Sequence, residues 1–174
     1  MLQLATIELF KEEMKFSAGH FTIFSATKRE NMHGHNYQVS VALIAQVVEL
    51  GLAFDYRFYK DKIKILCRQL NGFFLLPAHS KFLKIEEKDN EVHAIFNEEK
   101  LSFLKRDVLI LPLNNVTVEE LSRWFLSQLL FDVAELKKHA IQEILVKVSS
   151  SPGQLGSARW VNTSSETSDM EVKK

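Results

Sequence analysis

The sequence predicts a single α+β domain, an assignment that depends on three observations. Alternating apolar residues indicate strands near residues 5–15, 37–47 and 144–148. Two stretches with apolar residues at helical spacing lie between the second and third of these strands. The resulting order, two strands and a helix followed by a helix and two strands, suggests two related halves. We therefore expect one domain over residues 1–162, followed by a polar, frayed tail over 163–174.

The composition is that of an ordinary water-soluble chain. Of its 174 residues, 46% are hydrophobic and 25% are charged. The chain has 22 basic residues (lysine and arginine) and 22 acidic ones (aspartate and glutamate), so no net charge favours binding to nucleic acid or membrane. This balance still allows a local basic pocket for a phosphorylated ligand. No uninterrupted apolar run could cross a bilayer, and a single cysteine agrees with a reducing compartment. We expect a cytoplasmic protein with no nucleic-acid or membrane partner.

The first two strands are expected to pair as a long hairpin. Residues 37–47 alternate apolar and other side chains, as half-buried strands do. The segment 21–32 between the strands is polar and ends directly at a histidine pair. Loops of this kind commonly carry function.

The first helix is predicted over residues 57–70, where apolar residues recur at helical spacing. Its apolar stripe contains Tyr59, Ile63, Leu66, Cys67 and Leu70. Cys67 lies within the stripe, and no activating base is near it in the sequence. A buried thiol is therefore favoured over a nucleophile, and we assign Cys67 no chemistry.

The second half begins with short hairpin-like segments within residues 82–103, which we interpret as a peripheral insertion. A second helix is predicted to begin at Thr117, whose hydroxyl caps the first turn while Glu120 reaches back in a capping box. Its buried face is expected to comprise Leu121, Trp124, Phe125 and Leu129. The stretch 149–156 is expected to break the third strand, and residues 157–161 to return as a fourth.

The triplet His33-Gly34-His35, thirteen residues after His20, is the strongest functional signal. Residues i and i+2 of a strand share a face, so His33 and His35 point the same way, and His20 could join them from a paired strand. Three histidines leave a tetrahedral zinc ion with one open position, which is typical of catalytic sites. The alternative for the pair alone is that both histidines lie on a solvated strand face.

Several motifs resemble those of one known family. They are FSAGHF at 16–21, RENMHGHNY at 29–37, Phe54-Asp55, LLP at 75–77, TVEEL at 117–121 and SPGQ at 151–154. In this order they resemble the family of 6-pyruvoyl-tetrahydropterin and 6-carboxy-tetrahydropterin synthases. The resemblance extends over nearly the whole chain.

The resemblance implies the tunnelling fold, in which a four-stranded antiparallel sheet carries two helices on one face. It implies a homo-oligomer, with trimers closing a barrel and two trimers stacking as a homohexamer. It also implies Zn²⁺ held by His20, His33 and His35 at a site that a neighbouring subunit completes. The family's chemistry is that of a lyase acting on the side chain of dihydroneopterin triphosphate, by elimination of triphosphate or by side-chain cleavage.

The chain departs from the family pattern just before the histidine pair. Most members place a cysteine there, whereas this chain has Arg29 and a loop without a thiol. Glu30 is the candidate catalytic base, because a branch of the family that resembles this chain uses glutamate in that loop and cleaves the side chain to 6-hydroxymethyl-dihydropterin. The alternative for Glu30 is a solvated charge in a polar run.

Further departures concern the proton relay and the pterin ring. Asn71 and Gly72 stand where an Asp-His pair is expected. His79 is a candidate to replace that pair, but it is expected to be an exposed turn residue. Ser150 stands where a ring-binding glutamate is expected.

Recognition of the substrate ring is assigned to a second motif. Glu119 matches another acidic position of the family, and Thr117 belongs to the same motif, so both are candidate substrate-binding residues. The alternative for Glu119 is a charge that stabilises the helix start.

The sequence therefore supports two main hypotheses. One is a zinc-dependent lyase acting on a dihydropterin. The other is a divergent paralogue that keeps the fold and zinc but binds another small molecule or lacks the family activity. A zinc-stabilised scaffold is weaker, because an open three-histidine site suits catalysis better than stability. The pathway, whether folate, biopterin-like or queuosine-like, stays open.

Overall fold

The computed structural model describes residues 3–48 and 50–163. The predicted tail, 163–174, lies outside the described residues apart from its first position, so the domain boundary stays a prediction. Within the described part of the chain, no helix is long and apolar enough to cross a membrane.

The main element is a seven-stranded sheet with the order β10-β9-β3-β2-β4-β8, in which β1 also pairs with β3. Its strands are β1 (Leu4–Leu9), β2 (Lys15–His20), β3 (His33–Gln46), β4 (Phe74–Pro77), β8 (Val108–Leu111), β9 (Ile141–Ser151) and β10 (Gln154–Val161). The fourteen-residue β3 is the central strand, because β2 pairs with its first half and β1 with its second half. β9 pairs along its other edge.

The predicted four-stranded antiparallel sheet is therefore wrong in strand number and partly in direction. The antiparallel part comprises β10, β9, β3 and the two strands β1 and β2, because residues 10–14 turn and divide the predicted first strand. β4 then extends the sheet in parallel to β2, and β8 in parallel to β4. Both added strands have only four residues, too few for a clear alternating pattern.

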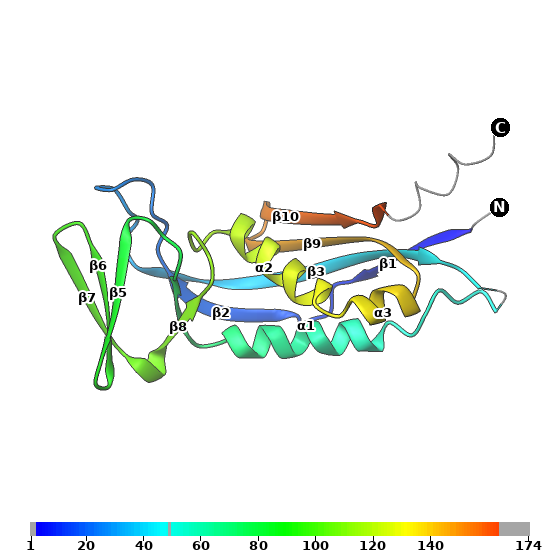
Figure 1. Ribbon diagram of the computed structural model, residues 1–174, viewed down its shortest axis with the longest axis horizontal. Coiled ribbons are helices and arrows are strands. Elements are labelled where there is room, and N and C mark those ends of the chain that lie inside the picture. Colours follow the sequence, from blue (N-terminus) through cyan, green and yellow to red (C-terminus); the bar gives the residue numbers. More distant parts are fainter. Residues whose placement is uncertain (1–2, 49, 164–174) are drawn as a thin grey trace, which may run out of the picture.

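Two long helices, α1 (Arg57–Leu70) and α2 (Val118–Leu130), cover one face of this sheet (Figure 1). α1 has the predicted bounds, and its five predicted apolar residues are all buried. Both helices share one core with alternate residues of β3, as the family resemblance predicted for helices on a single face. A short helix, α3 (Val133–Lys138), was not predicted.

The predicted peripheral insertion is a separate three-stranded antiparallel sheet of β5 (Leu83–Lys88), β6 (Glu91–Phe96) and β7 (Glu99–Leu104). A 3-10 turn, Lys105–Asp107, leads from it into β8. The inserted sheet lies at one end of the molecule, with α1 and α2 toward the other (Figure 1). It packs its own apolar cluster against Phe21 and Ile23 of the β2–β3 loop.

Two local predictions need correction. Thr117 does cap α2, since its hydroxyl accepts the Glu120 N–H at 3.3 Å. Glu120, however, does not complete the capping box: its carboxylate accepts the Asn114 N–H at 3.0 Å, so it holds the preceding loop instead.

The predicted break over 149–156 is also too long, because only residues 152–153 separate β9 from β10, with Gly153 at a φ of 83°.

Candidate metal centre

The three histidines extend the core-facing rows of two paired strands. In β2 the side chains of Phe16, Ala18 and His20 point to the helix-covered face. In β3 the same face carries Tyr37, His35 and His33, in that order toward the end of the strand. The antiparallel register sets His20 opposite His33. The period-two alternation of two strands thus gathers three imidazoles at one end of the sheet, as predicted.

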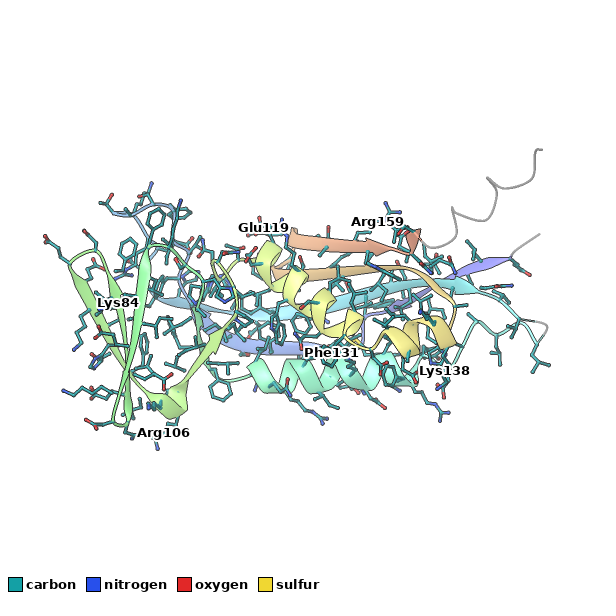
Figure 2. All side chains as sticks on the ribbon, viewed as in Figure 1. Lys84, Arg106, Glu119, Phe131, Lys138 and Arg159 are labelled. Carbon is teal, nitrogen blue, oxygen red and sulfur yellow. The ribbon has the colours of Figure 1, made fainter. Side chains whose placement is uncertain are left out.

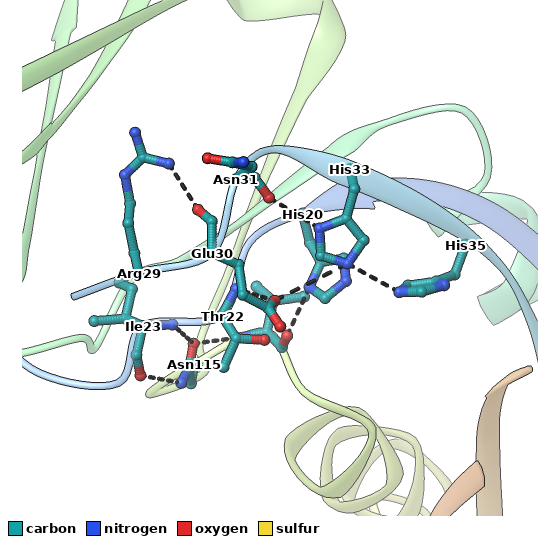
Figure 3. Close-up of polar contacts among 10 residues, drawn as sticks. His20, Thr22, Ile23, Arg29, Glu30, Asn31, His33, His35 and Asn115 are labelled. Atoms are coloured by element: carbon teal, nitrogen blue, oxygen red, sulfur yellow. Dashed lines mark hydrogen bonds and ion pairs between the residues drawn. The ribbon is translucent and has the colours of Figure 1, made fainter.

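The three rings converge on a common point (Figure 3). One ligand atom from each histidine lies within 4.8 Å of the others, and the Nε2 atoms of His33 and His35 are 3.0 Å apart. Two carbonyls orient the rings: Val116 O lies 2.8 Å from His20 Nδ1, and Asn31 O lies 2.9 Å from His33 Nδ1. A histidine that donates Nδ1–H to a carbonyl keeps the Nε2 lone pair free for a metal.

The buried His20 provides a direct test of whether a metal fits this cluster. It is only 5% exposed, and its Nε2 has no hydrogen-bond partner among the residues that the structure describes. Burial lowers the pKa of His20 to about 4, so the ring is neutral at physiological pH. An unpartnered buried nitrogen is costly unless something binds it. The donor set and this orphaned atom therefore fit a metal ion that accepts nitrogen ligands, such as zinc.

Glu30 lies beside the histidines, at the end of the β2–β3 loop. Its Oε2 accepts the Thr22 N–H at 3.0 Å and lies 4.0 Å from His33 Nε2. Burial alone would raise the pKa of this carboxyl, but hydrogen bonding to Thr22 and the neighbouring His33 lower the pKa below its ordinary value. Glu30 is therefore an ionised acceptor held by the backbone, and is not a freely solvated charge.

One cavity of about 350 Å³ contains all of the predicted site residues. Its lining includes the three histidines, Glu30, Thr117 and Glu119, together with Ser150. Thr117 and Glu119 come from the start of α2, and Ser150 comes from the end of β9. The structure thus brings together residues from distant parts of the sequence, such as His20 and Ser150.

Glu119 is exposed at the first turn of α2 (Figure 2), and its carboxylate makes no ion pair or hydrogen bond with the described residues. The close approach of β10 sets its position. A Cβ at Gly156 would lie 2.6 Å from the Val118 carbonyl carbon and 2.7 Å from Glu119 N. Only glycine therefore allows this contact. Glu119 thus lies at the helix start and also lines the cavity, and its role in substrate binding stays a prediction.

Several residues of the site were not predicted from the sequence. Thr22, Phe24, Tyr37 and Gln154 also line the cavity. Tyr37 follows directly from the alternation of β3, so the HGHNY motif could have indicated it. Thr22 and Phe24 belong to an irregular loop for which the sequence pattern gives no orientation.

Asn115 is a further missed residue, which supports the site from outside the cavity. Its side-chain oxygen accepts the Ile23 N–H at 3.1 Å, and its side-chain nitrogen donates to Ile23 O at 2.8 Å (Figure 3). The same oxygen accepts the Val116 N–H at 3.0 Å. Asn115 thus joins the β2–β3 loop to the residue that orients His20.

Three other residues considered in the sequence lie outside this cavity. Asn71 accepts the Ser17 N–H at 2.8 Å, which ends α1 against β2. His79 is an exposed turn residue, as expected. Cys67 is fully buried, and burial raises the pKa of its thiol to about 12, which agrees with the prediction that it has no chemical role.

The fold and the site define an α+β protein with a three-histidine cluster at the end of its sheet, beside a carboxylate and a cavity. The family model described as 6-pyruvoyl tetrahydropterin synthase matches residues 9–159. The chain belongs to the 6-pyruvoyl tetrahydropterin synthase family, as its motifs predicted.

Individual relatives agree with this assignment. The 6-pyruvoyl tetrahydropterin synthase of Plasmodium falciparum is 32% identical, with a TM-score of 0.86 over 91% of this chain and 99% of that one. Two Plasmodium vivax structures are 30% identical with TM-scores of 0.87, over 92% of this chain and 99% of theirs, and are variants in a glutamate described as a catalytic residue. A Methanocaldococcus jannaschii protein with the provisional name 6-carboxy-5,6,7,8-tetrahydropterin synthase is 25% identical over 81% of this chain and 86% of its own length.

Proposed function

We propose that this protein is a zinc-dependent lyase that acts on the side chain of dihydroneopterin triphosphate or a related dihydropterin. The observation that carries the proposal is the position of Glu30, whose carboxylate lies 4.0 Å from His33 Nε2 in the cavity that contains the histidine cluster. A carboxylate so close to a metal centre can take a proton from a ligand bound there.

His20, His33 and His35 would hold the zinc ion. Bound zinc would polarise oxygens of the substrate side chain and acidify the neighbouring C–H or O–H protons. Glu30 would accept such a proton on its carboxylate, and its low pKa keeps it ionised for this step at neutral pH. The variants of a catalytic glutamate in the P. vivax enzyme support this role by analogy. We propose that Glu30 is the corresponding residue.

The start of α2 would bind the pterin ring. The Glu119 carboxylate can accept hydrogen bonds from the amino-pyrimidine edge, and it has no competing partner among the described residues. The Thr117 oxygen accepts the Glu120 N–H, so its O–H stays available to donate. Ser150, at the position expected for a second acidic contact, can form one hydrogen bond but no charge-assisted pair.

The first experiment is mass spectrometry of the products after the zinc-loaded protein is incubated with dihydroneopterin triphosphate. Loss of triphosphate would identify elimination, and 6-hydroxymethyl-dihydropterin would identify side-chain cleavage. Glu30→Gln should keep zinc and lose at least about 100-fold in turnover, in line with general-base catalysis. Asp61→Asn, an exposed carboxylate on α1, is the matched control and should behave as wild type.

A second candidate is a divergent paralogue that keeps the fold and the metal but binds another small molecule or lacks the family activity. Ser150 in the cavity favours it, as do Asn71 and Gly72 at the positions of the expected Asp-His pair. Unchanged substrate in the presence of stoichiometric zinc would overturn the lyase proposal in favour of this one.

We also propose that the protein works as a homo-oligomer, as the family resemblance implies. The sheet ends in β10 on one side and in β8 on the other, so both edge strands offer backbone groups for pairing. Analytical ultracentrifugation distinguishes a trimer from a hexamer, and a monomer would contradict this part of the proposal.

A further inference from the structure

The Arg29 side chain connects the Glu30 peptide group to the inserted sheet. Its Nη1 donates to the Glu30 carbonyl oxygen at 2.8 Å (Figure 3). Its Nε donates to Oε2 of Glu99, the first residue of β7, at 2.8 Å, and its Nη2 contacts the same oxygen. One guanidinium therefore bonds two segments that are 70 residues apart in the sequence.

The surroundings of Arg29 restrict it to this position. Its side chain is only 15% exposed, although it carries a full charge. The guanidinium carbon lies 5.2 Å from the centre of the Phe21 ring and 5.9 Å from that of the Phe96 ring. Phe21 belongs to the β2–β3 loop and Phe96 to β6, and both are buried in the cluster beneath the inserted sheet. The cation thus lies over two rings, one from each side of the junction.

The opposite side of Glu30 is fixed by Thr22. The Glu30 N–H donates to Thr22 O at 2.9 Å, and the Thr22 N–H donates to the Glu30 carboxylate. Arg29 itself forms an isolated antiparallel bridge with Ile23, next to this pair. The Glu30 peptide is therefore held by the extension of β2 on one side and by the Arg29 guanidinium on the other.

We propose that Arg29 is a positioning residue, which fixes the Glu30 carboxylate beside the histidine cluster by anchoring the Glu30 carbonyl to the inserted sheet. Arg29 does not line the cavity, so it acts through Glu30 and not on a ligand. The inserted sheet would then support the site through Glu99, which accepts the hydrogen bond from Arg29. Its consequence for turnover rests on the proposed function, whereas its consequence for structure does not.

A lysine cannot replace Arg29 in this role. The planar guanidinium directs Nη1 toward one acceptor and Nε with Nη2 toward another, whereas an ammonium group carries all its N–H donors on one nitrogen at the end of a flexible stem. Arg29→Lys therefore keeps the charge and loses the two-sided connection. Arg159 is a matched control, because it makes a comparable two-pronged contact to Glu143 between β10 and β9, away from the cavity.

The first test needs no substrate. Amide hydrogen exchange of the Thr22 and Glu30 N–H groups reports on the contacts that hold the Glu30 carboxylate and peptide. Arg29→Lys should speed exchange at both amides by about tenfold or more, with the amides of β3 and β9 unchanged. Arg159→Lys should change neither. Unaltered exchange at Thr22 and Glu30 in Arg29→Lys would overturn the proposal.

The second test uses turnover and separates positioning from folding. Arg29→Lys should keep stoichiometric zinc and a KM within about threefold of wild type. Its kcat should fall about 10- to 100-fold, because a small misplacement of a catalytic group commonly causes a loss of this size. Glu99→Ala should reproduce this loss. Glu99→Gln, which keeps an oxygen acceptor, should restore most of it. A loss of zinc in step with activity, or equal effects of the two Glu99 variants, would contradict a positioning role.

The two proposals fail in different ways. A wild-type protein that binds zinc but leaves the pterin unchanged contradicts the lyase activity, and the exchange experiment then still decides the role of Arg29. If the wild-type protein turns over the pterin and Arg29→Lys does so equally well, only the positioning role is contradicted.

Discussion

The three histidines have similar chemistry but different surroundings. His20 is buried and oriented by Val116, whereas His33 is exposed and oriented by Asn31. His35 is half-buried, and burial together with the nearby His33 lowers its pKa. A low pKa favours the neutral imidazole that a metal requires. His20 is thus the buried member of the cluster, and His33 is its solvent-exposed member.

Replacement of the exposed His33 tests the metal assignment with less risk to the fold than replacement of the buried His20. His33→Ala should reduce bound zinc from about one ion per chain to a small fraction, because two histidines leave the tetrahedral site incomplete. Its fold should remain, since the side chain contributes little to the core. Metal content by mass spectrometry measures the effect, with His79→Ala, another exposed histidine, as the control. A His33→Ala protein that keeps one tightly bound zinc ion would refute the assignment.

Cys67 provides a second prediction at this scale. Because burial raises the pKa of its thiol to about 12 from an ordinary 9.0, its thiolate population is about a thousandfold below that of an exposed cysteine. We expect negligible reaction with a disulfide reagent at pH 8 in the native protein and rapid reaction in denaturant. The absorbance of the released thiolate follows both rates. Fast labelling of the native protein would contradict the burial of Cys67.

At the scale of elements, the start of α2 combines stability and function. Thr117 caps the helix, Glu119 faces the cavity, and Glu120 binds the Asn114 N–H and the Arg123 side chain, the latter at 2.9 Å. Burial alone would raise the pKa of Glu120, but these hydrogen bonds lower its pKa below the ordinary 4.5. Glu120 thus fastens the loop that carries Asn115 and Val116, and through Val116 it supports His20.

A lowered native pKa has a defined effect on stability. The unfolded chain takes up the Glu120 proton near pH 4.5, and the native protein does so only at lower pH, so this stabilisation is present above pH 4.5 and is lost as the pH falls. Glu120→Gln should therefore lower the free energy of unfolding at pH 7 by about 1 kcal/mol, and by much less near pH 3. Urea denaturation at both pH values measures this. Equal losses at both would contradict the ionic contribution.

Elements with a clear period could be predicted from the sequence, and short or irregular ones could not. The bounds of α1 and its buried face follow from the spacing of Tyr59, Ile63 and Leu70. β4 and β8 have four residues each, and their pairing depends on an insertion that returns the chain alongside β4. The same division applies to the site: strand alternation places the histidines, whereas the contacts of Thr22, Arg29 and Asn115 depend on how loops meet.

At the scale of the whole molecule, metal binding should stabilise the fold. The proposed ligands come from β2 and β3, so a bound ion would link two strands that unfolding separates. At a zinc concentration 100 times the Kd, the stabilisation is about 2.7 kcal/mol, which for a chain of this size raises Tm by roughly 5–10 °C. Thermal unfolding with zinc, with magnesium and with a chelator measures it. A shift of the same size with magnesium, or in His33→Ala, would contradict a nitrogen-ligated site.

The antiparallel alignment of His20 with His33 also makes the histidine cluster sensitive to errors in strand pairing. A slip of one residue between β2 and β3 would turn His33 and His35 to the face opposite His20, because strand side chains alternate. The three imidazoles can then no longer surround one ion. Only the correctly aligned hairpin can therefore bind zinc with all three ligands. In a population of refolding chains, the fraction that binds zinc would therefore equal the fraction in which β2 and β3 have paired in the native register.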